Sequence, residues 1–410
     1  MNGHSPSPAD RAVARLDELG QVSDHADLLT RSFLSPANLL AANLISSWME
    51  KLGMNIDHAV DGTIRGILPG SDRDATPLLL GSHIDTVFNA GRFDGSLGII
   101  VALAALETLR EQGITLTFPI HLLGFSDEEG TRFHTTYLGS RGIVGPLDEE
   151  TLERKDDAGD TLSSVLKREG WHDDAVEIRY APGEVLGYVE AHIEQGRVLE
   201  NEQLAACGVS AIVGQLRLRV TVTGGADHAG TTPMNQRRDA LAGAAECILA
   251  AERQGRECEG AVVTVGKLVL QPNVPNTIPQ STHFTIDLRH AIDEERTQLQ
   301  ETLHAEFSDI VRKRSLELTW TVVQETNAVP CDSALTEKML EAVSAVTGRR
   351  FCMASGAGHD GVIVSRIAPI TMLFVRCRDG LSHHPDEYAS PGDIADSVDI
   401  LVQFLNSLGA

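Results

Sequence analysis

The sequence has few of the features that mark secreted or membrane-spanning proteins. Its six cysteines are scattered without a Cys-x-x-Cys pair, which argues against a disulfide framework and against a thiolate metal site. No apolar run approaches the roughly 20 residues that a membrane helix needs. The polar first ten residues lack the basic and apolar regions of a signal peptide. We therefore expect a soluble protein of the reducing cytoplasm.

Basic residues are also scarce, since 34 Lys and Arg against 58 Asp and Glu give a formal net charge of −24. Nucleic acids and anionic membranes bind basic surfaces, so neither is an expected partner. The charge does not restrict the substrate, because the local charge of a site can oppose the global one. At 410 residues and 42% hydrophobic content, the chain is long enough for two or three packed domains.

The chain is organised around the stretch 81–98, which lies between a predicted buried strand and a predicted apolar helix. Open α/β sheets carry their chemistry at such strand ends. His83 and Asp85 share a face of the extended chain, so Asp85 could hold one imidazole nitrogen of His83 and leave the other for a metal. Asp94 follows in a flexible turn and can fold back towards His83. Taken alone, the stretch would more often be a core histidine with two turn acids.

Other predicted strand ends supply further polar groups. The acids 127–129 follow an apolar strand and could provide a metal ligand and a general base, although a solvated acidic turn is the commoner fate of such a run. His192 offers another imidazole ligand. Gln195 could hydrogen-bond a substrate carbonyl or amide, and this segment alone is equally compatible with a surface role.

Strands and helices alternate in the first and last thirds of the chain, which predicts an α/β fold with a mixed sheet flanked by helices. Between them, the order β-α-β-β-α-β predicts an inserted ferredoxin-like α+β domain. We therefore expect a discontinuous catalytic domain, 1–212 and 330–410, interrupted by a second domain, 213–329. The polar residues 146–185 are interpreted as a surface excursion. Predicted helices span 36–52, 99–109, 237–254, 293–314 and 334–346, with a last one capped by Ser390 and Pro391, and predicted strands span 78–80, 118–125, 216–223, 261–270, 282–289, 316–324 and 369–375.

The insert carries three notable polar side chains. His228 lies in a glycine-rich turn, Asn276 lies in a proline-rich connection, and Arg289 ends a strand. An arginine there could make a two-pronged contact with a carboxylate. Without a metal site elsewhere, ordinary turn chemistry and a surface ion pair would be the preferred interpretations.

Six motifs occur in one order along the chain: GSHIDTV, GRFDG, EEGTRF, YVEAHIEQG, HAGTTPM and SHHP. With these motifs the chain resembles the M20-type di-metal hydrolases. Within them it is most similar to the branch of N-carbamoyl-L-amino acid amidohydrolases, allantoate amidohydrolases and related ureido-acid hydrolases. HAGTTPM and EQG favour this branch over the peptidases. The resemblance covers nearly the whole chain and implies that the insert is a lid and dimerisation domain.

Position by position, the resemblance implies roles for individual residues. Two divalent cations are expected on His83, Asp94, Glu129, His192 and His383, with Asp94 bridging them. His384 directly follows His383, so the choice between these two stays open. Glu128 is the expected general base, and Asp85 is counted with the catalytic residues. Substrate-contacting positions are Gln195, Gln215, Asn276, Arg289 and Gly358, and His228 is expected to reach the active site of the partner subunit in a homodimer.

The implied chemistry is consistent with these residue types. A urea carbonyl is a poor electrophile, and two cations can polarise it and activate water near neutral pH. Glu128 would carry the proton from water to the leaving nitrogen, and His228 would stabilise the oxyanion. Imidazole and carboxylate ligands without thiolate suit Mn, Co, Ni or Zn. Two dications outweigh two ligand carboxylates, which favours an anionic substrate.

The leading prediction is hydrolysis of an N-carbamoyl-L-amino acid to the L-amino acid, ammonia and carbon dioxide. Allantoate is the first alternative, because it also presents a ureido group beside a carboxylate. An aminopeptidase or dipeptidase would need only the metal-binding half. A catalytically silent metal-binding or dimerisation protein is disfavoured, because both the ligands and the base are present.

Overall fold

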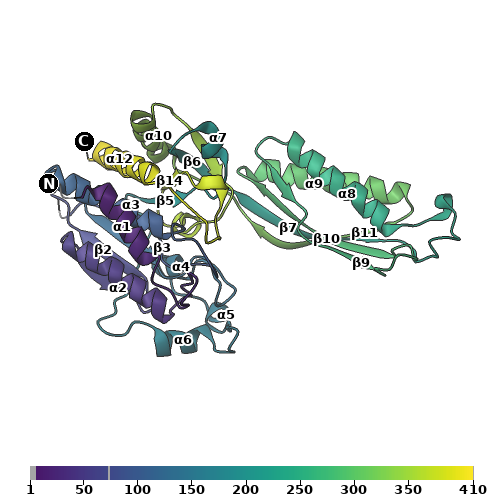
Figure 1. The fold of residues 1–410 in the computed structure, drawn as a ribbon, viewed down its shortest axis with the longest axis horizontal. Coiled ribbons are helices and arrows are strands. Elements are labelled where there is room, and N and C mark those ends of the chain that lie inside the picture. The colour runs from purple at the N-terminus through teal and green to yellow at the C-terminus, as the bar shows by residue number, and fades with distance from the viewer. Residues whose placement is uncertain (1–5, 73, 410) are drawn as a thin grey trace. The chain divides into compact units, whose positions relative to one another are not determined.

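The computed structural model describes residues 6–72 and 74–409, which form two compact units (Figure 1). The first unit comprises the chain up to Ser210, Cys331–Met353 and the chain from Ala357. The second comprises Ala211–Pro330 and Ala354–Gly356. Each unit has its own hydrophobic core. No helix of the described residues combines the length and apolarity needed to cross a membrane.

A mixed sheet forms the centre of the first unit, as predicted. Its strand order is β1-β2-β4-β3-β5-β14-β6-β12, where β12 is the short strand Val329–Pro330, and β13 also pairs β6. Strands β4, β3, β5 and β14 run parallel, whereas β1, β2 and β6 pair in antiparallel fashion. The strands are β1 (Asn55–His58), β2 (Ile64–Leu68), β3 (Leu78–His83), β4 (Ile120–Phe125), β5 (Gly187–Ile193), β6 (Ala206–Ile212), β13 (Cys352–Ser355) and β14 (Ile370–Val375).

Helix α3 (Ser96–Glu111) is buried along almost its whole length, between the sheet and the helices α1 and α12. A helix that is apolar all round is stable only in such a place. The predicted caps are confirmed, since Ser35 and Ser390 accept the amides of Asn38 and Asp393. The other helices are α1 (Pro8–Leu19), α2 (Pro36–Lys51), α4 (Leu138–Val144), α5 (Glu149–Leu152), α6 (Leu162–Glu169), α7 (Val198–Glu202), α10 (Ser333–Thr347), α11 (Gly361–Val364), α12 (Pro391–Leu408) and the 3-10 turn η2 (Arg378–Gly380).

Residues 146–185 are mostly exposed or half-buried, as expected of a surface excursion, but the helices within this segment were not predicted. This segment contains α5 and α6, and Leu162 and Val165 are completely buried beside Phe33 and Phe133. A few apolar side chains within a polar segment suffice to form this satellite core. Helix α1 was not predicted either.

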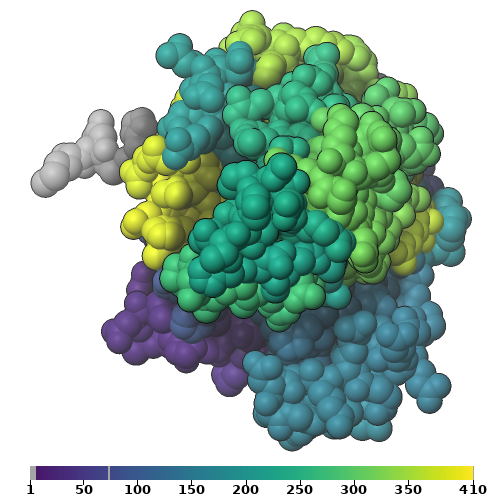
Figure 2. Space-filling model, turned by 90° about the vertical axis from the view of Figure 1, so that its right-hand side faces the viewer, coloured from purple at the N-terminus to yellow at the C-terminus, as the bar shows by residue number. Residues whose placement is uncertain are grey.

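The second unit has the predicted ferredoxin-like order. Its antiparallel sheet runs β11-β7-β10-β8, with β9 also pairing β10. Alternate residues of β7, such as Leu218, are buried, while Arg217 and Arg219 are exposed. The predicted strand 261–270 is divided into β8 and β9. The surface of this unit appears in teal to light green in Figure 2. Its elements are β7 (Gly214–Thr223), η1 (Met234–Gln236), α8 (Ala240–Glu257), β8 (Val262–Thr264), β9 (Leu268–Gln271), β10 (Ser281–His290), α9 (Asp293–Lys313), β11 (Glu317–Thr326) and β12 (Val329–Pro330).

Candidate metal centre

Two buried histidines and one buried aspartate converge in the first unit. His83 is the last residue of β3, His192 lies in the neighbouring strand β5, and Asp94 lies in the turn before α3. The two Nε2 atoms are 3.5 Å apart. Asp94 Oδ1 is 3.1 Å from the Nε2 of His192 and 3.7 Å from that of His83. The sequence predicted all three as ligands, and the structure places them together.

The other ring nitrogen of each histidine identifies the tautomer. His83 Nδ1 lies 3.0 Å from the backbone oxygen of Asp85 and 3.3 Å from its Oδ1, and His192 Nδ1 lies 3.0 Å from the backbone oxygen of Ile193. A carbonyl only accepts, so both Nδ1 atoms carry the proton and both Nε2 lone pairs face Asp94. Two lone pairs and a carboxylate at this spacing repel one another unless a cation lies among them. These residues therefore fit a divalent metal.

The pKa of His83 gives the same indication. Burial opposes its charge, yet the carboxylates of Asp85 and Asp94 outweigh burial and raise this pKa well above 6.5. The surroundings thus favour a positive charge at this point, which a proton or a metal ion can supply.

A second group of ligands lies on the other side of Asp94. His383 Nε2 is 3.2 Å from Asp94 Oδ2 and 3.3 Å from Glu129 Oε1. The neighbouring His384 is directed elsewhere, because its Nδ1 accepts the backbone amide of Asp386. Potential donor atoms of Asp94, Glu129 and His383 all lie within 4.8 Å of one another, as do those of His83, Asp94 and His192. The structure therefore places His383, not His384, in the cluster.

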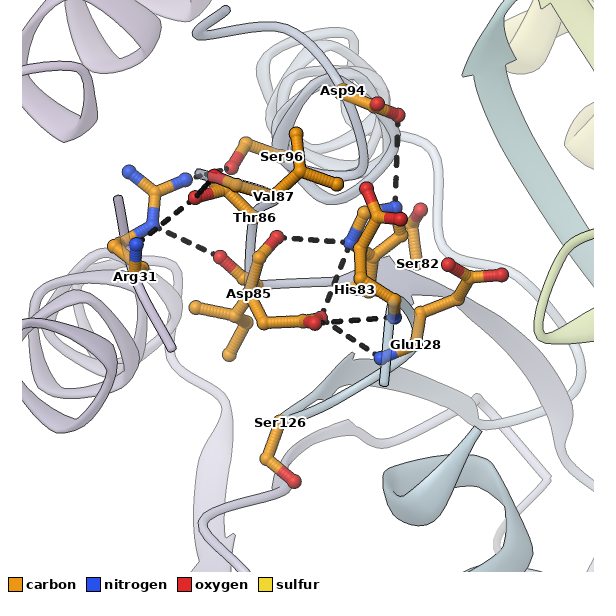
Figure 3. A network of polar contacts seen from close by, with 12 residues as sticks. Arg31, Ser82, His83, Asp85, Thr86, Val87, Asp94, Ser96, Ser126 and Glu128 are labelled. Atoms are coloured by element: carbon orange, nitrogen blue, oxygen red, sulfur yellow. Dashed lines mark hydrogen bonds and ion pairs between the residues drawn. The ribbon is translucent and has the colours of Figure 1, made fainter. Parts of the chain in front are cut away.

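Asp85 connects the metal-binding turn to the acidic pair after β4. Its Oδ1 accepts the amide of Glu128 at 2.9 Å (Figure 3), and its Oδ2 accepts that of Glu129 at 3.2 Å. Burial raises the pKa of Glu128 well above 4.5 and that of Glu129 to about 7. A buried carboxyl group with a raised pKa beside a metal cluster is suited to proton transfer.

Glu387 is a buried residue of this cluster that the sequence analysis missed. Its Oε1 accepts the amides of Phe93 at 2.8 Å and Asp94 at 3.0 Å. Ser382 Oγ lies 3.1 Å from Asp94 Oδ2 and 3.3 Å from Glu387 Oε2. A β-carbon at Gly91 would collide with Glu387, so only glycine fits there. The only indication in the sequence is that Glu387 lies two residues after the SHHP motif. This position does not reveal its contact with Phe93, which is distant in sequence.

Gln195 was predicted to contact substrate, and the structure places it beside Asp94. Its Nε2 lies 3.3 Å from both carboxylate oxygens of Asp94 and 3.0 Å from Ser382 Oγ. Gln195 Oε1 is buried and has no hydrogen-bond partner among the residues that the structure describes. Gly358 is exposed, and a β-carbon there would collide with the phenol oxygen of Tyr137.

In the second unit, Gln215 and Arg289 lie opposite each other on β7 and β10 and share one partner. Asp287 accepts from Gln215 Nε2 at 2.7 Å, and from Arg289 Nε and Nη2 at 2.8 and 3.1 Å. Arg289 Nη1 donates to the carbonyl of Gly356 at 2.6 Å. A cavity of about 580 Å³ lies here, lined partly by Arg217 and Arg289. Asp287 neutralises Arg289 and was not predicted from the sequence.

His228 and Asn276 lie on adjacent loops of the second unit. The amide of Ala229 donates to the backbone oxygen of Asn276 at 3.0 Å, and His228 forms a β-bridge with Thr277. His228 is exposed, and its Nδ1 accepts the amide of Gly230 at 3.1 Å. Its Nε2 is therefore the nitrogen available to a ligand.

Comparison with known proteins gives consistent matches over nearly the whole chain. The sequence model described as peptidase family M20/M25/M40 matches residues 79–407. Allantoate deiminase 2 of Glycine max is 38% identical over 97% of this chain and 89% of its own length. N-carbamoyl-L-amino acid amidohydrolase of Geobacillus stearothermophilus is 37% identical, covering 96% of each chain. A hydantoinase/carbamoylase family amidase from Burkholderia multivorans superimposes with a TM-score of 0.90 at 31% identity, covering 98% of both chains.

Proposed function

The chain belongs to the peptidase family M20/M25/M40, and we propose that it hydrolyses the carbon–nitrogen bond of a linear ureido acid. The first candidate substrate is an N-carbamoyl-L-amino acid, converted to the L-amino acid, carbon dioxide and ammonia. Allantoate is the second candidate, because relatives named for both substrates match at similar identity. The observation that carries the proposal is the convergence of His83, His192 and Asp94 beside the buried Glu128.

The ligand set supports two divalent cations. His83, His192 and Asp94 would hold one, and Asp94, Glu129 and His383 would hold the other, with Asp94 shared. Mn, Co, Ni and Zn all suit imidazole and carboxylate donors. When bound, such ions polarise a carbonyl and make water a stronger nucleophile.

The chain's own residues supply the proton transfers and the orientation. Glu128 would accept the proton of the attacking water and deliver it to the departing nitrogen. Asp85 would hold the backbone of Glu128 during this transfer, since it accepts the Glu128 amide. His228 would donate a hydrogen bond to the developing oxyanion.

Arg289 can still recognise a substrate carboxylate despite its pair with Asp287. A guanidinium has five N–H groups. Three of them are engaged by Asp287 and Gly356, which leaves two. Asp287 thus orients the guanidinium, and the remaining donors would bind the substrate carboxylate with Gln215 beside them. Asn276 and Gly358 are proposed as further substrate contacts.

We also propose a homodimer formed through the second unit, in which His228 completes the active site of the partner subunit. A mixing experiment tests this arrangement, with His228→Ala and Glu128→Gln as two inactive variants. After subunit exchange, half of the dimers are mixed, and one of their two sites carries both residues. Activity should recover to about a quarter of wild type. No recovery despite exchange would place His228 in its own subunit's site.

The proposed reaction is tested by ammonia release from N-carbamoyl-L-methionine and, in parallel, from allantoate by the Mn-loaded enzyme. Turnover of the first alone supports a carbamoylase, and turnover of allantoate alone selects the second candidate. Glu128→Gln serves as the matched blank. Release of amino acids from dipeptides without ammonia from either ureido acid would replace the proposal with a peptidase.

A further inference from the structure

Arg31 is a completely buried arginine whose side chain forms no ion pair among the described residues. It is 1% exposed, and all its contacts lie within the first unit. Nε donates to the backbone oxygen of Ile84 at 2.9 Å, and Nη1 donates to that of Leu19 at 2.9 Å. Nη2 donates to Ser96 Oγ at 2.8 Å. One side chain therefore connects three separate segments, and Figure 3 shows it beside Ser96.

Two of these segments flank the proposed metal ligands directly. Ile84 follows His83, and Ser96 is two residues after Asp94. The backbone of Arg31 adds to this connection, because its amide donates to Thr86 Oγ1 and its carbonyl accepts the amide of Thr86. Arg31 thus holds both ends of the turn that runs from the first ligand to the second.

The geometry between those ends tolerates little movement. Gly95 has φ 65°, and a β-carbon there would lie 2.5 Å from the ring of His83. The imidazole of His83 therefore packs directly against the backbone of Gly95. The next residue is Ser96, whose hydroxyl accepts a hydrogen bond from Arg31. A shift of Ser96 would move Gly95 and Asp94 relative to His83.

The buried charge also has an electrostatic role. Burying an unpaired guanidinium is unfavourable, and the carbonyl of Leu19 at the C-terminal end of α1 offsets a part of this cost because a helix C-terminus favours cations. Burial lowers the pKa of Arg31 to about 10, while the charge of Asp85 acts in the opposite direction. Arg31 therefore remains a cation at pH 7, close to a site crowded with carboxylates.

We infer that Arg31 is a positioning residue of the metal centre, which sets the separation of His83 and Asp94 by holding Ile84 and Ser96. This inference rests on the metal centre proposed above. A lysine retains the charge but has a single nitrogen, which cannot span the three segments that the guanidinium connects.

The experiment compares the Mn²⁺ affinity of wild type and Arg31→Lys, measured by competition with a chelating indicator. The variant should bind about 10- to 100-fold more weakly, the usual effect of disturbing groups that orient metal ligands. Arg296→Lys is the matched control for loss of a buried arginine. Arg296 is 2% exposed and bonds Thr326 and Glu325 in the second unit. The Arg296→Lys variant should have a lower melting temperature in EDTA than wild type and an unchanged Mn²⁺ affinity.

Ser96→Ala provides a second variant that retains Arg31, so the test holds even if Arg31→Lys does not fold. It should weaken Mn²⁺ binding several-fold with little change in metal-free stability. Wild-type affinity in Arg31→Lys, or in Ser96→Ala if the lysine variant is unfolded, would overturn the inference while leaving the metal centre standing. Failure of wild type to bind any of Mn²⁺, Co²⁺, Ni²⁺ and Zn²⁺ would instead reject the metal centre itself.

Discussion

The carboxylate of Asp85 accepts the backbone amide of Glu128 at 2.9 Å. The same carboxylate lies 3.3 Å from Nδ1 of His83, whose other ring nitrogen, Nε2, is directed to Asp94 and His192. One side chain therefore fixes an imidazole ligand from β3 and the candidate base after β4. The positions of ligand and base are coupled through Asp85, although the two belong to different strands.

Asp85→Asn should disturb both partners together. An asparagine retains one acceptor oxygen, and its NH₂ group would face a backbone N–H that the carboxylate now binds. We expect Mn²⁺ affinity to fall about 10- to 100-fold and kcat to fall as well. The control is Asp57→Asn, which removes an ion pair with Arg65 on β1 and β2. Equal metal affinities of the two variants would contradict the role of Asp85.

Glu128 and Glu129 are adjacent and should nevertheless respond differently to the same substitution. Glu128→Gln should retain metal and lose about 10²- to 10⁴-fold in kcat, the usual contribution of a general base. Glu129→Gln should lose metal, because Glu129 lies with Asp94 and His383. Metal content by elemental analysis and turnover of the same samples distinguish the two roles. Near wild-type turnover of Glu128→Gln would reject it as the base.

The sequence allowed the candidate ligands to be predicted because each stands in a short motif, and those of His83, Glu129 and His192 lie at the ends of strands. It did not reveal Glu387 or Arg31, since their partners are distant in sequence and are often backbone atoms. Glu387 binds the amide of Phe93, 294 residues away. A backbone amide leaves no trace in composition or spacing. The alternation of Leu218 and Arg219 predicted the second unit's sheet, whereas the division of β8 from β9 depends on pairing with β10, which periodicity does not encode.

Glu387→Ala should destabilise the fold more than Glu387→Gln. Alanine leaves the buried amides of Phe93 and Asp94 without an acceptor, and each unsatisfied group costs about 1–3 kcal/mol. Glutamine retains an oxygen for them. Urea unfolding in EDTA measures the difference, and Mn²⁺ affinity should fall in the alanine variant as Asp94 moves. Equal stabilities of the two variants would show that the amide contacts contribute little.

His121 should make the first unit sensitive to acid. Burial, and next the charge of Arg65, lower the pKa of His121 from 6.5 to about 4. The unfolded chain therefore takes up a proton below pH 6.5 that the folded chain resists, so this contribution to stability is complete above pH 6.5 and declines towards pH 4. As the pH falls from 7 to 5, the free energy of unfolding should decrease less in His121→Phe than in wild type. A difference that stays constant with pH would contradict the lowered pKa.

Metal affinity should rise with pH between about 6 and 9. The hydrogen bond to Asp94 raises the pKa of His383 to about 9, and burial raises that of Glu129 to about 7. At pH 7 the metal-free protein therefore holds a proton on His383 and a partial one on Glu129, and both must leave before these side chains bind a cation.

Calorimetry of Mn²⁺ binding in buffers of different ionisation enthalpy should reveal this proton release, and His383→Ala should reduce it. Above pH 9 both groups are largely deprotonated before binding, so their share of the proton release and of the rise in affinity should cease there, leaving only the share of His83, whose pKa is also raised. Proton release that is absent at pH 7 would mean that His383 and Glu129 do not ligate the metal.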